Sequence, residues 1–338
     1  MFNKLMSLVK VFCFVLIASA FVPLGHSANA ASHTGRGPVF KIIQIKGDLY
    51  FVVAGFHRTA FLVTPEGIIL GDPISLAVSK WLKKQFSQRF GSTVKYVIYS
   101  HHHPDHASGG SVFADTATFV GHEQVAVALK EALPRDAAPQ DKNGDGRLSR
   151  AEATDHAYPR SFNRYDRNGD GFITGAEINA FTPLPDIVYR DRMTITLGGS
   201  RVELMHPGPA HSEDQTVLLF PEQRAAMAVD FLNVKRLPAT LYHYPIPQYV
   251  DAIAKVQALD FDIMIPGHGN LGTKADLIPY VKFLRALDAA VASGIAKGKS
   301  LEEMRKSIVF PELKQWVLYE PRRVNLINET YEILTKKP

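Results

Sequence analysis

Hydrophobic positions along the first third of the chain fall into short runs, broken by turns and by one amphipathic stretch. Thr64-Pro65-Glu66-Gly67 has the composition of a hairpin turn, since proline presets φ and glycine accepts positive φ. Residues 75–90 repeat apolar side chains at helical spacing and predict a helix. This alternation of strands and helices favours an α/β layer architecture. The strand-like runs are 40–45, 49–54, 60–64, 68–70 and 94–99.

Residues 134–183 differ from their surroundings, because they are rich in Asp, Asn, Gly and Arg and contain an internal repeat. Strand-like runs resume after them, and from residue 277 the pattern is helical, notably over 280–292 and 324–334. We therefore interpret 134–183 as an insertion into one α/β domain. The predicted segments are a signal peptide over 1–30, the first part of the domain over 38–133, the insertion over 134–183, the second part over 184–276 and a C-terminal helical segment over 277–338.

The N-terminus has the three parts of a secretory signal peptide. Lys4 and Lys10 flank an apolar run over 11–22, and Ala28-Asn29-Ala30 is a small-x-small cleavage pattern. A signal anchor is the alternative, but the run is short for a membrane span. Cleavage after Ala30 would give a periplasmic or secreted protein without a transmembrane segment and would remove Cys13, the only cysteine.

The composition narrows the possible partners and ligands. The chain has 338 residues, of which 46% are hydrophobic and 21% charged, as in ordinary globular proteins. Its formal net charge of +5 is spread without a Lys/Arg run, so we expect no nucleic-acid partner. With no cysteine after cleavage, a transition metal would need histidine and carboxylate ligands.

The most informative string is His101-His102-His103-Pro104-Asp105-His106, which follows the apolar run 94–99. Alternate side chains at a strand end can converge in one cleft, and imidazoles with a carboxylate are the ligands that zinc takes in the absence of thiolates. A solvated His-rich loop is the alternative. Three further candidates, His211, Asp230 and His268, each follow a strand-like run. Taken singly, each would more often be a cap or a turn residue.

Together these motifs resemble those of the metallo-β-lactamase-fold hydrolases, in the order His-x-His-x-Asp-His, Gly-x-x-His, Asp after a strand and Gly-His-Gly, with Leu70-Gly71-Asp72 before them. The resemblance covers nearly the whole mature chain outside the insertion. It implies a four-layer αββα sandwich with two zinc ions per chain at one edge. It further implies that His101, His103 and His211 hold one zinc, that Asp105, His106 and His268 hold the other, and that Asp230 bridges them.

The other histidines are interpreted as non-ligands. His102 lies between two candidates, so strand alternation points it the other way. His206 lies five residues before His211 and is the alternative to it, although the Gly-x-x-His spacing favours His211. His57, His122 and His243 are expected at the surface or at the edge of the core.

A pair of zinc ions also predicts a reaction. Two ions a few Å apart lower the pKa of a shared water, and the hydroxide would attack a carbonyl or phosphoryl centre of a small-molecule substrate. Asp105 would bind metal and orient this nucleophile. The candidate substrates are lactones, thioesters, esters and lactams. The lack of cysteine excludes the β-lactamases that use a cysteine ligand, and Asp230 favours thioesterase, lactonase and phosphodiesterase-like relatives. Tyr242-His243-Tyr244, Trp316 and Tyr319 are candidate pocket residues, although aromatic residues more often pack in a core.

The insertion has a second kind of metal motif. Residues 141–152 fit the twelve-residue EF-hand calcium loop, 166–177 fit it again, and each has the glycine of position six. Leu148 and Ile173, at position eight, predict a short strand contact between the loops. The chain would therefore bind up to two Ca²⁺. The predicted oxygen ligands are Asp141, Asn143, Asp145, the Arg147 carbonyl, Ser149 and Glu152 in the first loop, and Asp166, Asn168, Asp170, the Phe172 carbonyl, Thr174 and Glu177 in the second.

The insertion departs from a full EF-hand pair. Residues 153–165 leave room for one short helix between the loops, interrupted by Pro159, where a full pair has two. Pro139 also denies the first loop an ordinary entering helix. We therefore expect weak affinity, in about the 10⁻⁴–10⁻³ M range, and a role for calcium in ordering the insertion or gating the cleft. Asp/Asn-rich turns without calcium are the alternative.

The leading hypothesis is an exported dinuclear zinc hydrolase with a calcium-binding insertion. One alternative is a redox enzyme that uses iron on the same fold. Another is a calcium-dependent binding module on a catalytically silent scaffold, although the complete set of ligand positions argues against it.

Overall fold

The computed structural model describes residues 39–135, 137–154 and 158–336. The predicted signal peptide over 1–30, with Cys13, lies outside these residues. Within them, no helix combines the length and the apolar character that crossing a bilayer requires.

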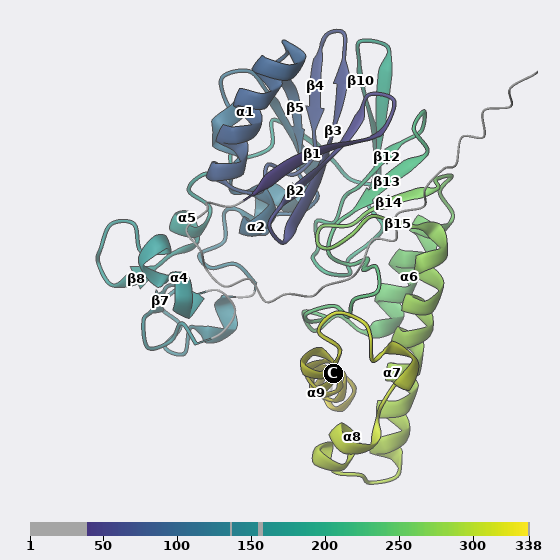
Figure 1. The fold of residues 1–338 in the computed structure, drawn as a ribbon. Helices are drawn as coiled ribbons and strands as arrows, with labels where there is room; N and C mark the ends of the chain where they lie inside the picture. The colour runs from purple at the N-terminus through teal and green to yellow at the C-terminus, as the bar shows by residue number, and fades with distance from the viewer. Residues whose placement is uncertain (1–38, 136, 155–157, 337–338) are drawn as a thin grey trace, which may run out of the picture. The chain divides into compact units, whose positions relative to one another are not determined.

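Two sheets lie at the centre of the fold (Figure 1). In the first sheet, the spatial order of the described strands is β1 (Phe40–Lys46), β2 (Leu49–Ala54), β3 (His57–Thr64), β4 (Gly67–Leu70), β5 (Val94–Ile98), β6 (Thr118–His122) and β9 (Ile187–Tyr189). β1 to β4 are antiparallel neighbours, and the strands from β4 to β9 are parallel. The predicted turn joins β3 to β4, where the Thr64 hydroxyl donates to the Gly67 carbonyl at 2.8 Å and Gly67 has a φ of 146°. β3 begins earlier than predicted, at His57.

The second sheet is mostly antiparallel. Its described strands lie in the order β10 (Arg192–Leu197), β11 (Ser200–Met205), β12 (Val217–Phe220), β13 (Ala225–Ala228), β14 (Ile263–Ile265) and β15 (Gly272–Thr273). Only β13 and β14 pair in parallel among these strands, because α6 (Ile246–Gln257) crosses between them. β12 and β13 are buried along their whole length, which explains their unbroken apolar runs.

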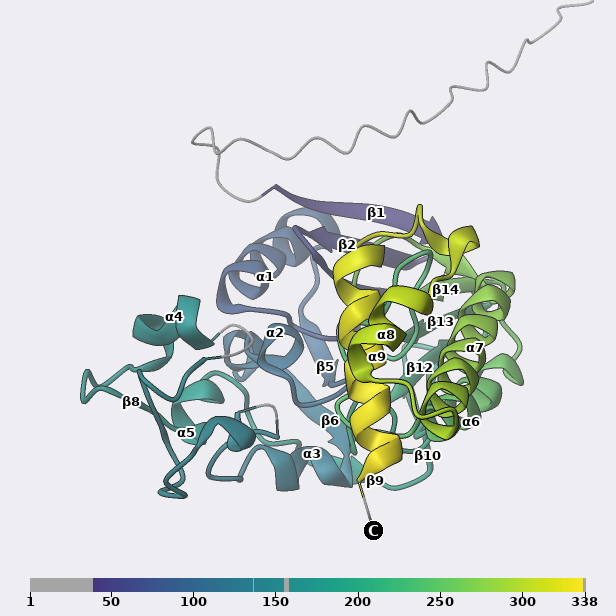
Figure 2. The same cartoon turned by 90° about the horizontal axis from the view of Figure 1, so that it is seen from below.

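Helices cover the outer faces of both sheets (Figures 1 and 2), so that three apolar interfaces separate four layers. α1 (Leu76–Phe90) buries Val78, Leu82 and Phe86 against the first sheet, and each such burial stabilises the fold by about 1.5–3 kcal/mol. α6 and α7 (Leu277–Ala296) cover the second sheet. The predicted four-layer αββα sandwich is therefore confirmed.

The ends of α1 follow from its flanking residues. Ser75 precedes the helix, and its hydroxyl oxygen accepts from the Val78 N–H at 3.5 Å. Gly91 follows it with a φ of 58°, a left-handed conformation that glycine adopts without a Cβ clash.

The insertion contains β7 (Leu148–Ser149), α4 (Tyr158–Tyr165), β8 (Phe172–Ile173) and α5 (Gly175–Ile178) around a small core of its own (Figure 1). Leu148 pairs with Ile173 in a short antiparallel ladder, at the two positions where the sequence predicts the contact. Pro159 lies in the first turn of α4, where its missing N–H would have no intrahelical partner, so it starts this helix rather than interrupting it.

The described part of the C-terminal segment, up to residue 336, contains the α-helices α7, α8 (Leu301–Ser307) and α9 (Tyr319–Thr335). Their apolar faces join those of α6 and the second sheet in one core, to which Trp316 and Tyr319 belong. These two aromatic residues therefore pack in the core. The remaining helical elements are α2 (Pro104–Ala107), α3 (Glu123–Ala128) and the short 3₁₀ turns Gly110–Phe113, Ala138–Gln140, Lys274–Asp276 and Pro311–Leu313.

Candidate metal centre

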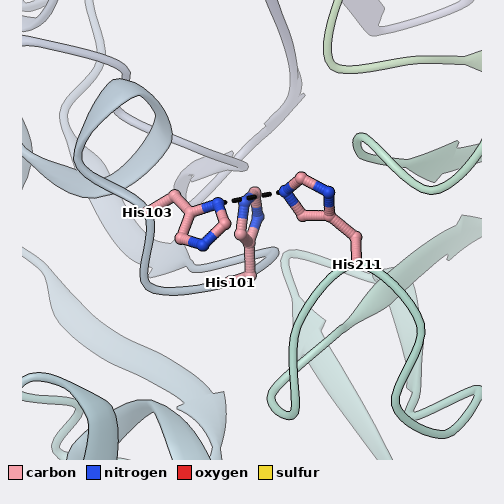
Figure 3. A group of neighbouring side chains, drawn as sticks. All are labelled: His101, His103 and His211. Carbon is pink, nitrogen blue, oxygen red and sulfur yellow. Dashed lines mark hydrogen bonds between the residues drawn. The ribbon is translucent and has the colours of Figure 1, made fainter. Parts of the chain in front are cut away.

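Three histidines from two loops converge to form what we call the first metal group: His101, His103 and His211. His101 and His103 follow β5, and His211 lies in the loop between β11 and β12 (Figure 3). Their ligand atoms lie within 4.8 Å of one another, and His103 Nδ1 is 3.0 Å from His211 Nε2. The exposed fractions are 0%, 5% and 7%, so the group is shielded from bulk water.

Four side chains form the second metal group: Asp105, His106, Asp230 and His268. Pro104 begins the short helix α2, which places Asp105 and His106 in its first turn. His106 Nε2 lies 3.4 Å from His268 Nε2, and each is 3.3 Å from one carboxylate oxygen of Asp230. The Asp105 side chain is 46% exposed and is therefore the member of this group most open to a substrate.

Asp230 lies between the two groups. Its Oδ2 atom is 3.5 Å from His211 Nε2 and 3.3 Å from His106 Nε2. The residue follows β13 and has a φ of 66°, a conformation that is strained for a side chain larger than glycine. Such strain is retained where a site requires the geometry, and here it turns one carboxylate toward both groups.

A glycine lets the loop after β14 approach this centre. A Cβ on Gly267 would lie 2.3 Å from Asp230 Oδ1 and 3.0 Å from His106 Cε1. Glycine is therefore required directly before His268, which explains the first glycine of Gly-His-Gly.

Outer partners fix which ring nitrogen faces the centre. The Ser100 hydroxyl donates to Asp72 Oδ2 at 2.7 Å, so it accepts from His101 Nδ1 at 2.9 Å. His106 Nδ1 lies 3.1 Å from Asp72 Oδ2, and His268 Nδ1 donates to the Phe56 carbonyl at 3.1 Å. In all three histidines Nε2 is thus left to face the group.

The donor atoms of the two groups suit a transition metal. His101 Nε2 is buried and has no hydrogen-bond partner among the described residues, although burial without a partner is costly for an imidazole nitrogen. A metal ion bound to this nitrogen would supply the missing partner. The outer carboxylate that holds His106 is of the kind that orients histidine ligands in metalloproteins.

Burial controls the charge of the first group. Burial, together with the neighbouring histidines, lowers the pKa of His103 to about 3 and that of His211 to about 3, and it lowers the pKa of His101 as well. These imidazoles are therefore neutral near pH 7, which is the form that binds a metal.

The second group has the opposite charge pattern. Burial lowers the pKa of His268, but Asp230 and Asp105 outweigh it and raise that pKa to about 9. The pKa of His106 is raised for the same reason. Burial alone would raise the pKa of Asp230, yet the two histidines hold it below its usual range. Without a metal, this group is an imidazolium–carboxylate cluster, so metal binding must displace protons.

The seven predicted zinc ligands all lie in these two groups. The alternative His206 does not, because its ring stacks on His122 with centroids 4.0 Å apart. His102 points away from both groups, and its Nδ1 lies 3.1 Å from Asp214.

His57, expected at the surface or the core edge, lies beside the second group. Its Nε2 atom is 3.4 Å from Asp105 Oδ2, and its ring centroid is 5.0 Å from that of His268. β3 brings it there, since His57 forms an isolated bridge with His268 between the two sheets. No local motif marks this histidine.

A loop after β13 and helix α9 close the centre. The Glu329 carboxylate, on α9, accepts from the Leu241 and His243 N–H groups at 2.7 Å and from the Thr240 hydroxyl at 2.8 Å. This holds Tyr242 and His243, which have φ values of 49° and 59°. Tyr242, a candidate pocket residue in the sequence analysis, lines the cavity beside the metal groups. Sequence reasoning did not identify Arg236, Arg322 or Glu329, because no motif marks them.

The two predicted calcium loops adopt the same conformation. In the first, the Asp141 carboxylate accepts from the Gly144 and Gly146 N–H groups at 2.7 and 2.9 Å. In the second, Asp166 accepts from Gly169 and Gly171 at 2.9 and 3.2 Å. The last carboxylate also folds back in both loops, where the backbone N–H of Lys142 donates to Glu152 at 3.1 Å and the backbone N–H of Arg167 donates to Glu177 at 3.0 Å.

Comparisons with known proteins agree with this geometry. A family model described as the Metallo-beta-lactamase superfamily matches residues 79–268. The linear primary-alkylsulfatase of Pseudomonas sp. (strain ATCC 19151) is 26% identical over 214 residues, which are 61% of this chain and 40% of that protein. The 2,4-dinitroanisole O-demethylase subunit alpha of Nocardioides sp. (strain JS1661) is 22% identical over 227 residues, 66% of this chain and 56% of that protein.

The solved structures show the same fold. A metallo-beta-lactamase from Pontibacter korlensis superposes with a TM-score of 0.51 at 16% identity, covering 73% of this chain and 99% of that one. By contrast, the chain spans about half the length of the curated relatives that it matches.

Proposed function

The chain belongs to the metallo-beta-lactamase superfamily, and from this we propose that it is a dinuclear zinc hydrolase acting on a small molecule with a carbonyl-type bond, such as a lactone, thioester, ester or lactam. One observation carries the proposal: outer partners hold Nδ1 of His101, His106 and His268, so that Nε2 of each faces a metal group.

Two bound zinc ions would supply a water of lowered pKa and an electrophile for the substrate oxygen. The residues of the chain contribute position and charge. Asp230 joins the groups, and Asp105 presents a half-exposed carboxylate toward the cavity, where it would orient a water that attacks the substrate. His57, 3.4 Å from Asp105, restricts the orientation of that carboxylate.

A larger cavity supports a substrate with an apolar part. It has a volume of about 810 Å³ and opens beside His57, Asp105 and Tyr242. Ile74 and Leu76 line it from the sandwich. From the insertion it is lined by Tyr158, Tyr165, Ile178 and Phe181.

A second candidate substrate is a sulfate ester, because one relative is an alkylsulfatase. A panel of carbonyl esters, lactones, thioesters and alkyl sulfates therefore covers the proposed chemistry.

Metal content measured against pH tests the proposal. The first group has neutral imidazoles down to low pH, whereas His268 holds its proton up to a pKa of about 9 in the absence of metal. Because a raised pKa makes the proton compete with the metal below that pH, zinc binding to the second group weakens as pH falls. We expect about two zinc per chain near pH 8.5 and about one near pH 6, with hydrolysis requiring the second.

Elemental mass spectrometry measures the zinc content per chain at each pH, and a hydrolysis assay on the same samples measures turnover. Iron in place of zinc, with redox turnover, would favour the redox enzyme. Failure to bind any transition metal after reconstitution would contradict the hydrolase and leave the calcium module as the working part.

We also propose that the insertion binds up to two Ca²⁺ and that the chain is exported. The repeated loop conformation supports calcium binding, since the first and twelfth carboxylates fold toward the same turn in both copies. The predicted signal peptide supports export, which would place the loops in millimolar calcium. N-terminal sequencing of exported protein should start at Ala31, and retention of the N-terminus would contradict cleavage.

Calcium is expected to raise the free energy of unfolding by about 1.4 kcal/mol per site at ten times the dissociation constant. Glu152→Gln and Glu177→Gln should each remove one site. Glu177 directly precedes Ile178, which lines the larger cavity. Glu177→Gln should therefore also raise KM, and Glu152→Gln less so. Thermal unfolding in calcium, with magnesium as the control ion, measures the first effect. Equal calcium stabilisation of wild type and both variants would refute the assignment.

A further inference from the structure

The histidines of the first metal group are held in different ways. His101 has an outer partner for its Nδ1 atom, as described above. By contrast, among the described residues, the rings of His103 and His211 form no hydrogen bond with a residue outside the group, and their Nδ1 and Nε2 atoms lie 3.0 Å apart. The positions of these two rings therefore depend on the backbone that carries them. We call residues 99–103 the first ligand loop and residues 206–216 the second ligand loop.

One buried carboxylate joins these two loops. Asp214 lies in the second ligand loop, three residues after His211, and is 0% exposed. Its Oδ2 atom accepts from the backbone N–H of His102 at 2.8 Å, and each of its two oxygens lies 3.1 Å from His102 Nδ1. Because His102 lies between His101 and His103, the carboxylate holds the first ligand loop midway between two predicted ligands.

A backbone hydrogen bond joins the same loops a short distance away. The Thr216 N–H donates to the Ser100 carbonyl at 2.7 Å. Ser100 directly precedes His101 and His102 directly follows it, so the two connections lie on either side of this ligand. Two connections restrict rotation of one loop against the other, which a single connection would allow. The distance between the ligands of the two loops is therefore set by Asp214 together with this backbone bond.

The charge of Asp214 also reaches the first metal group. Burial alone would raise the pKa of Asp214, but His102 outweighs this effect and lowers the pKa below its usual range, so the group is a carboxylate near pH 7. Burial and then His102 lower the pKa of His103, whereas Asp105 and Asp214 act in the opposite direction. A buried negative charge beside three neutral imidazoles favours a cation between them.

We propose that Asp214 is a positioning residue of the first metal group, and that through His102 it fixes the first ligand loop against the second so that the three imidazoles converge on one ion. The inference rests on the proposed function for the presence of zinc, and it does not depend on which bond is hydrolysed. It also assigns a role to His102, which lies between two ligands without being one.

Zinc affinity of the whole chain tests this role. A chromophoric chelator competing for zinc at pH 6, where the first group is expected to be the occupied one, measures it without turnover. Asp214→Asn keeps an oxygen for the His102 N–H but removes the charge, and it should weaken zinc binding about 10-fold. Asp214→Ala should weaken it about 100-fold. His102→Ala keeps the backbone N–H that Asp214 accepts from, so its effect should be smaller than that of Asp214→Ala.

The visible absorption of Co²⁺ bound in place of zinc gives a second readout. Its bands depend on the arrangement of the ligands, so they should change in Asp214→Asn if the loops shift. A purely structural role would lower the melting temperature and leave these bands as in the wild type. If Asp214→Ala does not fold, Asp214→Asn and His102→Ala carry the comparison.

Two control variants separate positioning from general damage. Asp186→Asn removes the charge of a carboxylate that accepts from the Phe119 N–H at 2.8 Å and belongs to neither metal group. Leu82→Ala leaves a cavity between α1 and the first sheet and lowers stability at a distance from both loops. Both variants should keep the zinc affinity and the Co²⁺ bands of the wild type.

The outcomes are distinct. If Asp214→Asn keeps the wild-type zinc affinity and Co²⁺ bands, or loses no more affinity than Leu82→Ala, Asp214 does not position the ligands. A wild-type protein that binds neither ion also overturns the proposal. Weakened zinc binding in Asp214→Asn, in a protein that hydrolyses no compound of the substrate panel, keeps the positioning role and rejects the proposed hydrolase.

Discussion

Asp230→Asn is expected to lower kcat/KM by about 10³-fold or more, corresponding to roughly 4 kcal/mol, and to reduce bound zinc from two per chain to one or none. The carboxylate lies within 3.5 Å of histidines in both metal groups, so one substitution weakens both. Asparagine keeps the size of the side chain, which preserves the packing against Gly267. The effect therefore isolates the charge.

The same substitution has a second expected signature. Asp230 raises the pKa of His106 and of His268, so both pKa values should fall in the metal-free variant. NMR titration of the histidine rings measures this. Asp260→Asn is the matched control, because Asp260 forms an exposed salt bridge with Arg224 and belongs to neither metal group. Turnover within threefold of wild type with two zinc retained would contradict Asp230 as the shared ligand.

Glu329→Ala is expected to lower the free energy of unfolding by about 3–5 kcal/mol. The buried carboxylate accepts from two backbone N–H groups and one hydroxyl in the loop over 240–243, and alanine leaves these donors without a partner. Tyr242 and His243 then lose the contacts that hold their positive φ angles. Because this loop lines the cavity at the metal groups, kcat/KM should fall as well.

Urea unfolding and the hydrolysis assay measure the two effects. Glu332→Ala, on an exposed face of the same helix, is the control and should change stability by less than about 0.5 kcal/mol. If Glu329→Ala were as stable and as active as Glu332→Ala, then α9 would not hold the loop. A loss of activity with little loss of stability would locate the effect in the loop alone.

Much of the sandwich could be predicted because its strands carry the pattern locally. The run 49–54 coincides with β2, and the other strands whose ranges are predicted differ from the structure by a few residues at their ends. Among these predicted strands the largest difference is at β3, where His57-Arg58-Thr59 looks like a polar turn, whereas β6 (Thr118–His122) was not predicted as a strand. These residues are strand because β2 pairs with them and Arg58 bonds to the loop after β14. Such pairing is set by tertiary structure.

The seven candidate metal ligands could be located because each follows a strand within a short motif. The residues that position these ligands or surround them could not be located in this way. Asp72 stands in a strand-end motif, but its bonds to Ser100 and His106 depend on the parallel pairing of β4 and β5. Arg322 and Glu329 come from the last helix and reach the centre only through its packing. A single residue whose contacts are distant in the sequence belongs to no motif of fixed spacing, so the sequence alone does not reveal its role.

Each metal group takes members from both sides of the insertion. His101, His103, Asp105 and His106 precede it, and His211, Asp230 and His268 follow it; β9, which completes the first sheet, also follows it. A protease that nicked the exposed loop at Gly144 would therefore separate the chain into two pieces that share a sheet and both metal groups. The two fragments would remain associated through the shared sheet and through the apolar core between the two sheets, and metals bound by both fragments would add a further link. Loss of the metals would then remove only one of the links between the two pieces, and the nick would stay silent until the core itself unfolded.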